Sequence, residues 1–223
     1  MEYKNSADMA MPQIVRELLV EAGCVLTEQI ERALCQHLSL VQKWNDYASL
    51  VSERDLSNLI ETHLIDSLSL VPVIVRLKRT NGVLLDIGSG GGFPAIPVKI
   101  MLPRLRIVMV ERSERKAAFL QKAILALGVR EAKVIHGSFP EALDSLQSDL
   151  ITARAVEEPE RLLVSVLTIL PENAFFFCQI PSQKLDVPPG FHVEPVRDAW
   201  TKCGLRRGEL HIVSRSKPRN TDS

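Results

Sequence analysis

A glycine-rich stretch that follows a short apolar run constrains the fold of this chain more than any other part of its sequence. The run Val83–Ile87 has the composition of a buried parallel strand and carries one carboxylate, Asp86. Four of the next five residues are glycine, and Pro94 and Pro97 follow, where the first turn of a helix tolerates them. A strand, a glycine loop and a helix in this order let the backbone approach a ligand closely. The stretch therefore predicts the floor of a nucleotide-like cofactor site.

Strand and helix patterns alternate after this loop, whereas the chain before it is helical. Apolar residues recur at helical spacing between Pro12 and Val75, and no strand pattern precedes residue 81. The alternation is typical of an α/β fold with a mostly parallel sheet flanked by helices. We expect an N-terminal helical cap over residues 1–80, a Rossmann-like core over 81–216 and a flexible tail over 217–223. The seven expected strands span residues 83–87, 106–110, 132–135, 149–153, 174–178, 192–196 and 209–214.

Composition and charge set broad limits. No run of ~18 apolar residues occurs, so we expect no membrane span. The first ten residues also lack the apolar core of a signal peptide, so we expect a cytoplasmic protein. The four cysteines are scattered without a Cys-x-x-Cys pair, which predicts no metal site. Basic and acidic residues balance at 27 each, although basic ones gather over 101–130 and after 201. Such faces suit phosphate contact, but charge alone favours an ordinary solvated face.

Two cofactor classes fit the glycine loop. A dinucleotide site has the pattern Gly-x-Gly-x-x-Gly, and Gly88 and Gly90 match its first two glycines while Phe93 occupies the third. The pattern Asp-x-Gly-x-Gly-x-Gly is met in full over residues 86–92, and it is similar to motif I of class I S-adenosylmethionine-dependent methyltransferases. Glu111, which ends the next predicted strand, suits the ribose hydroxyls in both classes. The loop favours the methyl donor and leaves the dinucleotide open.

Further segments resemble a single family in order and spacing. They are LVQKWN at Leu40–Asn45, SLVSERD at Ser49–Asp55, HLIDS at His63–Ser67, the glycine loop at Asp86–Pro97, and the dipeptide Arg154–Ala155. Together they are similar to the motifs of the RsmG family, also called GidB, which methylates guanine N7 in small-subunit rRNA. The glycine loop alone indicates only the superfamily, whereas the segments in front of it are much more specific.

The resemblance implies a class I methyltransferase fold and a defined reaction. The protein would transfer a methyl group from S-adenosyl-L-methionine to N7 of a guanine in the 530 loop of 16S rRNA. Its partner would be 16S rRNA or the small ribosomal subunit, and we expect a monomer. Guanine N7 has a free lone pair and no proton to remove, so we expect no general base and name no catalytic residue. Two alternatives are a class I methyltransferase of another substrate and a catalytically weak, RNA-binding ribosome assembly factor.

The resemblance also implies the cofactor contacts. Glu111 would bind the ribose hydroxyls, and the turn at Phe139 and Pro140 would hold the adenine. Arg154 would lie at the mouth of the site, although a surface ion pair with Glu157–Glu158 is its alternative. The expected cofactor-binding residues are Asp86, Gly88, Gly90, Phe93, Glu111, Phe139, Pro140 and Arg154.

Four residues are candidates for RNA contact. Arg115 and Lys116 open the helix after the second predicted strand, and Arg54 lies in the segment that resembles the second family motif. His63 lies on a cap helix, where a hydrogen-bonded pair with Asp66 that fixes the cap to the core is an equally good interpretation.

Two positions depart from the family pattern. Pro140 stands where the family usually has an acid, so a side-chain hydrogen bond to adenine would be lost unless Glu141 replaces it. The family commonly has Lys-Gly after the fifth strand, where this chain reads Cys178–Ile180. These two departures are the support for the assembly-factor alternative.

Overall fold

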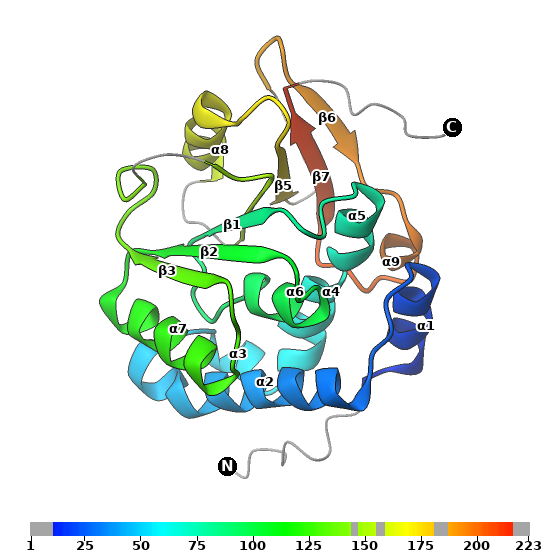
Figure 1. Cartoon of the computed structure of the whole chain (residues 1–223), viewed down its shortest axis with the longest axis vertical. Helices are drawn as coiled ribbons and strands as arrows, with labels where there is room; N and C mark the ends of the chain where they lie inside the picture. Colours follow the sequence, from blue (N-terminus) through cyan, green and yellow to red (C-terminus); the bar gives the residue numbers. More distant parts are fainter. Residues whose placement is uncertain (1–10, 144–146, 155–158, 181–186, 216–223) are drawn as a thin grey trace.

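The protein is built around a seven-stranded sheet with the strand order β3-β2-β1-β4-β5-β7-β6 (Figure 1). The computed structural model describes residues 11–143, 147–154, 159–180 and 187–215, so the expected tail over 217–223 lies outside the described residues. β7 runs antiparallel to both of its neighbours, and the other strands share one direction. The predicted fold class is therefore confirmed. The strands are β1 (Val83–Ile87), β2 (Arg106–Glu111), β3 (Ala132–His136), β4 (Leu150–Ala153), β5 (Phe175–Ile180), β6 (His192–Pro195) and β7 (Glu209–Ser214).

The central strands are buried on both faces, which explains their continuous apolar runs. All four residues of β4 are buried, as are the last four of β1. The register pairs Ile87 with Val110 on one side and with Ala153 on the other. The carboxyl ends of β1, β2 and β4 therefore meet at one edge, and the loops that follow these strands converge there.

Most helices cover one face of the sheet, and a single hydrophobic cluster joins those before β1 to those after it. α2 packs against both α6 and α7, and α4 packs against α6. Buried members of this cluster include Leu38, Leu68, Ile96 and Phe119. The N-terminal helices thus share one core with the sheet, and the domain boundary at residue 80 stays a prediction. These helices are α1 (Gln13–Glu21), α2 (Glu28–Ala48), α4 (Ile65–Leu68), α5 (Val71–Arg76), α6 (Ala95–Met101) and α7 (Glu114–Ala126).

A second cluster lies on the opposite face of the sheet. There, α8 (Pro159–Ile169) packs Val166 and Leu167 against the inward side chains of the central strands, among them Ile151 and Phe176. The two clusters make a three-layered arrangement, and the sheet edge between the layers remains accessible to ligands.

The helical character predicted for the chain up to Val75 is confirmed, and the structure divides it into several elements. Its last part comprises a π-helical turn, η2 (Ile60–Leu64), followed by α4 and α5, and Pro72 lies in the first turn of α5. A short helix, α3 (Glu53–Leu56), follows the end of α2 at Ala48. The four-residue helix α9 (Ala199–Lys202) was not predicted, because one turn is too short to show a periodic pattern.

Candidate functional site

A cavity of about 530 Å³ opens at the carboxyl edge of the sheet. Its walls are the ends of β1 and β2, the turn over residues 137–141 after β3, Arg154 after β4, and one face of α8. Ligand cavities in proteins typically span about 300–1,000 Å³, and open α/β sheets bind ligands at this edge. The cavity is therefore the candidate site.

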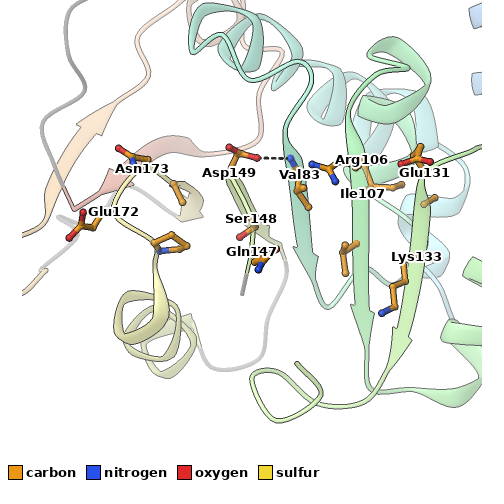
Figure 2. Close-up of a pocket in the computed structure, with 14 residues that line it drawn as sticks. Val83, Arg106, Ile107, Glu131, Lys133, Gln147, Ser148, Asp149, Glu172 and Asn173 are labelled. Atoms are coloured by element: carbon orange, nitrogen blue, oxygen red, sulfur yellow. Dashed lines mark hydrogen bonds between the residues drawn. The ribbon is translucent and has the colours of Figure 1, made fainter. Parts of the chain in front are cut away.

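A larger hollow of about 770 Å³ lies at the opposite, amino edge of the sheet (Figure 2). It is lined by the starts of strands, such as Val83 and Arg106, and by side chains of both charges. The carboxylate of Asp149 in its wall accepts a hydrogen bond from the Val83 backbone N–H at 2.8 Å, so this group links β1 to the turn before β4. None of the predicted site residues lines this hollow.

The glycine loop forms one wall of the cavity, and its glycines are needed for different reasons. Gly88 and Gly92 have φ of +70° and +82°, a region that other residues rarely adopt. A Cβ atom added to Gly92 would lie 2.5 Å from Cδ1 of Ile96, whereas one added to Gly88 would meet no atom within 4 Å. A side chain at 92 would therefore force the buried Ile96 to move, while Gly88 leaves space beside the cavity that it lines.

Glu111 holds the loop and faces the cavity at the same time. Its Oε2 accepts a hydrogen bond from the Gly90 N–H at 2.9 Å, and its Oε1 accepts one from the Ser113 N–H at 2.8 Å. The residue is 5% exposed and lines the cavity. Each carboxylate oxygen can accept a further hydrogen bond, so the carboxylate can still bind hydroxyl groups of a ligand.

His37 holds the loop from the other side. Burial lowers the pKa of this α2 side chain to about 4, so the ring is neutral, and its Nε2 lies 2.8 Å from the Gly91 carbonyl oxygen. Since a carbonyl can only accept, Nε2 carries the proton and donates it. Sequence reasoning missed His37, because a single histidine on a helix gives no signal of its partner.

The structure places the ring of Phe93 behind the loop, away from the cavity lining. Phe93 is 6% exposed and packs between two histidines, with ring centroids 4.8 Å from His37 and 5.0 Å from His63. Phe93 does not line the cavity, and its contact with the cofactor stays a prediction. Gly90 and Asp86 also lie behind the lining residues, while the predicted contacts Gly88, Glu111, Phe139, Pro140 and Arg154 all line the cavity.

His63 pairs with Asp55 and not with Asp66, which corrects the alternative considered above. Its Nε2 lies 3.4 Å from an Asp55 carboxylate oxygen. Burial, aided by the guanidinium of Arg154, lowers the pKa of His63, so the ring is neutral at pH 7. A neutral ring stacked on Phe93 supports the loop and offers no charge to a phosphate.

Asp66 and Arg154 form the ion pair that connects the N-terminal helices to the site. Arg154 Nη2 lies 2.8 Å from Asp66 Oδ2, and Nη1 donates to Ser67 Oγ at 3.2 Å. The Asp66 side chain is fully buried, and that of Arg154 is 15% exposed where it lines the cavity. The expected alternative partners, Glu157–Glu158, lie outside the described residues.

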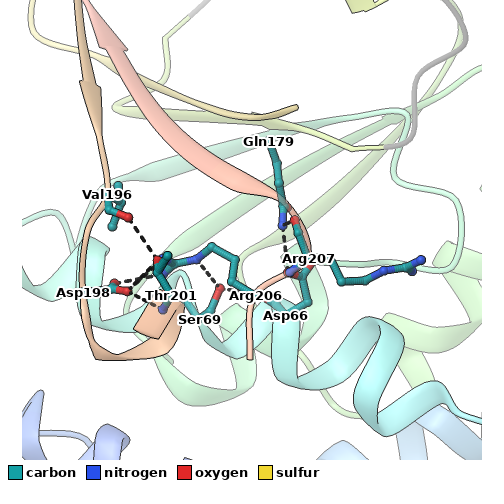
Figure 3. A network of polar contacts seen from close by, with 8 residues as sticks. All are labelled: Asp66, Ser69, Gln179, Val196, Asp198, Thr201, Arg206 and Arg207. Carbon is teal, nitrogen blue, oxygen red and sulfur yellow. Dashed lines mark hydrogen bonds and ion pairs between the residues drawn. The ribbon is translucent and has the colours of Figure 1, made fainter. Parts of the chain in front are cut away.

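The other oxygen of Asp66 binds two further segments (Figure 3). Oδ1 accepts hydrogen bonds from Gln179 Nε2 and from the Arg207 backbone N–H, each at 2.8 Å. Gln179 occupies the position where the family resemblance suggested lysine, and here its amide is a donor within this network.

Of the four residues predicted for RNA contact, only Lys116 lines the cavity. Arg115 lies over the ring of Tyr47, 5.5 Å from its centroid, and Arg54 is exposed on α3. Next to Pro140, the exposed Glu141 also lines the cavity, so an acid is available close to the position where the family usually has one.

Sequence reasoning did not identify the α8 wall, formed by Arg161, Leu162 and Ser165. Burial raises the pKa of the Cys178 thiol to about 11, so this thiol is not ionised at neutral pH. No group of three metal-binding side chains occurs among the described residues. In the same part of the chain, no helix combines the length and the apolar character that a membrane crossing requires.

Asp86 is the most perturbed acid of the site. It is 1% exposed, and its Oδ2 has no hydrogen-bond partner within the described ranges. Burial raises its pKa to about 8, although Ser89 and the Arg154 guanidinium act in the opposite direction. Without a ligand, the carboxyl is therefore largely protonated at neutral pH.

Comparisons with known proteins agree on one family. The sequence model of the family described as rRNA small subunit methyltransferase G (GidB) matches residues 30–184. A Neisseria meningitidis serogroup B protein named Ribosomal RNA small subunit methyltransferase G is 33% identical over 94% of this chain and 100% of its own length. A Marinobacter nauticus protein of the same name is 30% identical over 92% of this chain and 96% of its own length.

A solved structure with a similar fold was determined in complex with S-adenosylmethionine. It is a mutant of MtNAS, which superimposes with a TM-score of 0.58 at 17% identity and covers 92% of this chain and 77% of its own. At this identity the likeness shows the fold alone.

We predict that Asp86→Asn changes how stability depends on pH. The folded-state pKa of about 8 lies above the ordinary value of 3.8, so between these values the folded chain keeps a proton that the unfolded chain has released. Stability from this group therefore falls as pH rises, by at most about 1.4 kcal/mol per pH unit. Urea unfolding should show that the free energy of unfolding of the variant, relative to that of the wild type, increases from about pH 5 to about pH 7. Parallel curves would contradict the prediction, and Asp46→Asn, at an exposed site, is the control.

We also predict that Gly92→Ala is much more destabilising than Gly88→Ala. Both variants adopt an unfavourable positive φ, but only the methyl group at 92 collides with Ile96. The expected losses in the free energy of unfolding are about 2–4 kcal/mol at 92 and about 1 kcal/mol at 88. Denaturant unfolding measures both, and equal losses would show that packing does not distinguish the two glycines.

Proposed function

The chain belongs to the rRNA small subunit methyltransferase G family, and on this premise we propose that it methylates N7 of a guanine in the 530 loop of 16S rRNA. The observation that carries the proposal is the cavity at the carboxyl edge, which brings Gly88, Glu111 and Arg154 together. The methyl donor is S-adenosyl-L-methionine.

The residues around the cavity fit the methyl donor. Glu111 lies in the wall with spare acceptor capacity, which suits the two ribose hydroxyls. Phe139 and Pro140 provide an apolar surface for the adenine, and Gly88 leaves open space at the backbone for the methionine part. Bound there, the donor supplies an electrophilic methyl group on a sulfonium.

The acceptor requires positioning and no proton transfer. The N7 lone pair of guanine is free at neutral pH, so the protein need only hold N7 in line with the methyl group. No residue is proposed as a general base. Arg154 reaches the cavity wall and is fixed by Asp66, so it can orient the base or the cofactor without moving itself. Lys116 is a further cation in the cavity lining.

We propose that the protein acts on 16S rRNA or on the small ribosomal subunit, as a monomer and in the cytoplasm. An assembly factor with weak catalysis remains the second candidate only through the departures at Pro140 and Gln179, and Glu141 in the cavity wall weakens the first of these.

The direct test is methyl transfer by the purified protein. Naked 16S rRNA and isolated small subunits from a strain that lacks the gene are incubated with labelled methyl donor, and the modified nucleotide is located by mass spectrometry. We expect one 7-methylguanine in the 530 loop. Gly88→Ala, which adds a methyl group at a residue that lines the cavity, should abolish transfer while remaining folded. Methylation of another base, or of no RNA, would exclude the proposed reaction, and absence of donor binding by calorimetry would favour the assembly factor.

We predict that Arg154→Ala loses both turnover and stability. Removing the guanidinium leaves the fully buried Asp66 without its cation, which costs about 3 kcal/mol, although Gln179 and the Arg207 N–H still donate to it. Adding Asp66→Asn to this variant should restore part of the stability and none of the turnover. If the double variant regains turnover with stability, Arg154 serves only to hold the fold.

A further inference from the structure

The loop between α9 and β7 carries two consecutive arginines in opposite surroundings. Arg206 is 7% exposed, whereas the side chain of Arg207 is 54% exposed. In the sequence, both arginines belong to the same basic stretch after residue 201. In the structure, the guanidinium of Arg206 is buried and paired within the protein, whereas that of Arg207 is exposed to solvent.

Arg206 fixes the loop through an unusually complete set of hydrogen bonds (Figure 3). Its Nη1 and Nη2 donate to the two carboxylate oxygens of Asp198, each at 2.9 Å. Nε donates to Ser69 Oγ at 3.1 Å, and Nη2 donates to the Ser69 carbonyl at 2.9 Å. Nη1 also donates to Thr201 Oγ1 at 2.7 Å. A bidentate, fully paired guanidinium of this kind stabilises one geometry, so the loop is held against both α9 and the segment after α4.

The backbone of Arg207 is fixed next to the candidate site. Its N–H donates to Asp66 Oδ1 at 2.8 Å, and its carbonyl accepts a hydrogen bond from Gln179 Nε2. The second oxygen of Asp66 binds Arg154, which lines the cavity. One carboxylate therefore separates the Arg207 backbone from the cavity wall.

The side chain of Arg207, in contrast, is only weakly held. Its Nη1 lies 3.4 Å from the Thr62 carbonyl and 3.9 Å from Asp55 Oδ1, on the surface. Exposed ion pairs at such distances contribute little, so a stronger anion can replace them. The other Asp55 carboxylate oxygen lies 3.4 Å from His63 Nε2, and the His63 ring stacks on Phe93, so the Arg207 guanidinium lies close to the residues that support the glycine loop.

We propose that Arg207 is a positioning residue that binds a phosphate group of the rRNA beside the target guanine. A guanidinium binds a phosphate with two parallel hydrogen bonds, and a backbone that is already ordered reduces the entropic cost of doing so. The inference rests on the proposed function, since it names a contact of that substrate at that site. Arg206 has no contact with RNA in this arrangement, because its guanidinium is occupied by the protein.

The test compares Arg207→Gln with Arg104→Gln, which removes the same charge from an exposed turn before β2, at the amino edge of the sheet. We expect Arg207→Gln to raise KM for the small subunit or 16S rRNA about tenfold, with kcat and donor affinity unchanged. The slope of log affinity against log salt should fall by about one phosphate contact, roughly 0.7–0.9. Arg104→Gln should leave all four quantities at wild-type values, and Arg207→Lys should retain part of the affinity.

Each outcome decides the inference. Equal effects of the two glutamine variants would mean that only the net charge matters and would overturn it. A loss of donor binding or of melting temperature in Arg207→Gln would assign the residue to the fold and would also overturn it. If the wild-type protein methylates the 530 loop and Arg207→Gln does so with an unchanged KM, this inference fails while the proposed function stands. If the wild-type protein methylates no rRNA, both fail together.

Discussion

The arrangement of the site depends on one fully buried carboxylate, that of Asp66. A charge removed from water in this way must be paired and hydrogen-bonded, or the fold becomes much less stable. Its partners come from three places far apart in the sequence: Arg154 after β4, Gln179 in β5, and the Arg207 backbone before β7. Satisfying this carboxylate therefore fixes the N-terminal helices, the cavity wall and the last loop relative to one another.

Hydrogen bonds to side chains from two distant segments also fix the glycine loop. Glu111 binds it from the sheet and His37 binds it from α2, a helix that precedes the sheet in the sequence. A Cβ atom added to Gly92 would meet both Ile96 in α6 and His37 in α2, so the loop is packed between its own helix and an N-terminal helix. These helices thus support the loop that lines the candidate site, although none of their residues lines the cavity itself.

The sequence predicted those features that local patterns determine. Continuous apolar runs indicated the parallel strands, and the ends of β1 and β2 led directly to Gly88 and Glu111, which face one cavity. Local patterns could not show that the Phe93 ring turns away from this cavity, because side-chain direction in a loop is decided by its packing partners. The partners of Asp66, more than 80 residues away, and the α8 wall likewise follow from tertiary packing, which a single sequence does not reveal.

The antiparallel direction of β7 has a consequence for how the protein is made. Because this strand, unlike the other six described strands, starts at the carboxyl edge, it delivers Arg206 and Arg207 there only after those strands have been synthesised. During translation the earlier helices and strands can form while the Asp66 carboxylate still lacks one of its donors. The hydrogen bonds that attach Asp66 to the sheet are completed only when the loop before β7 has left the ribosome.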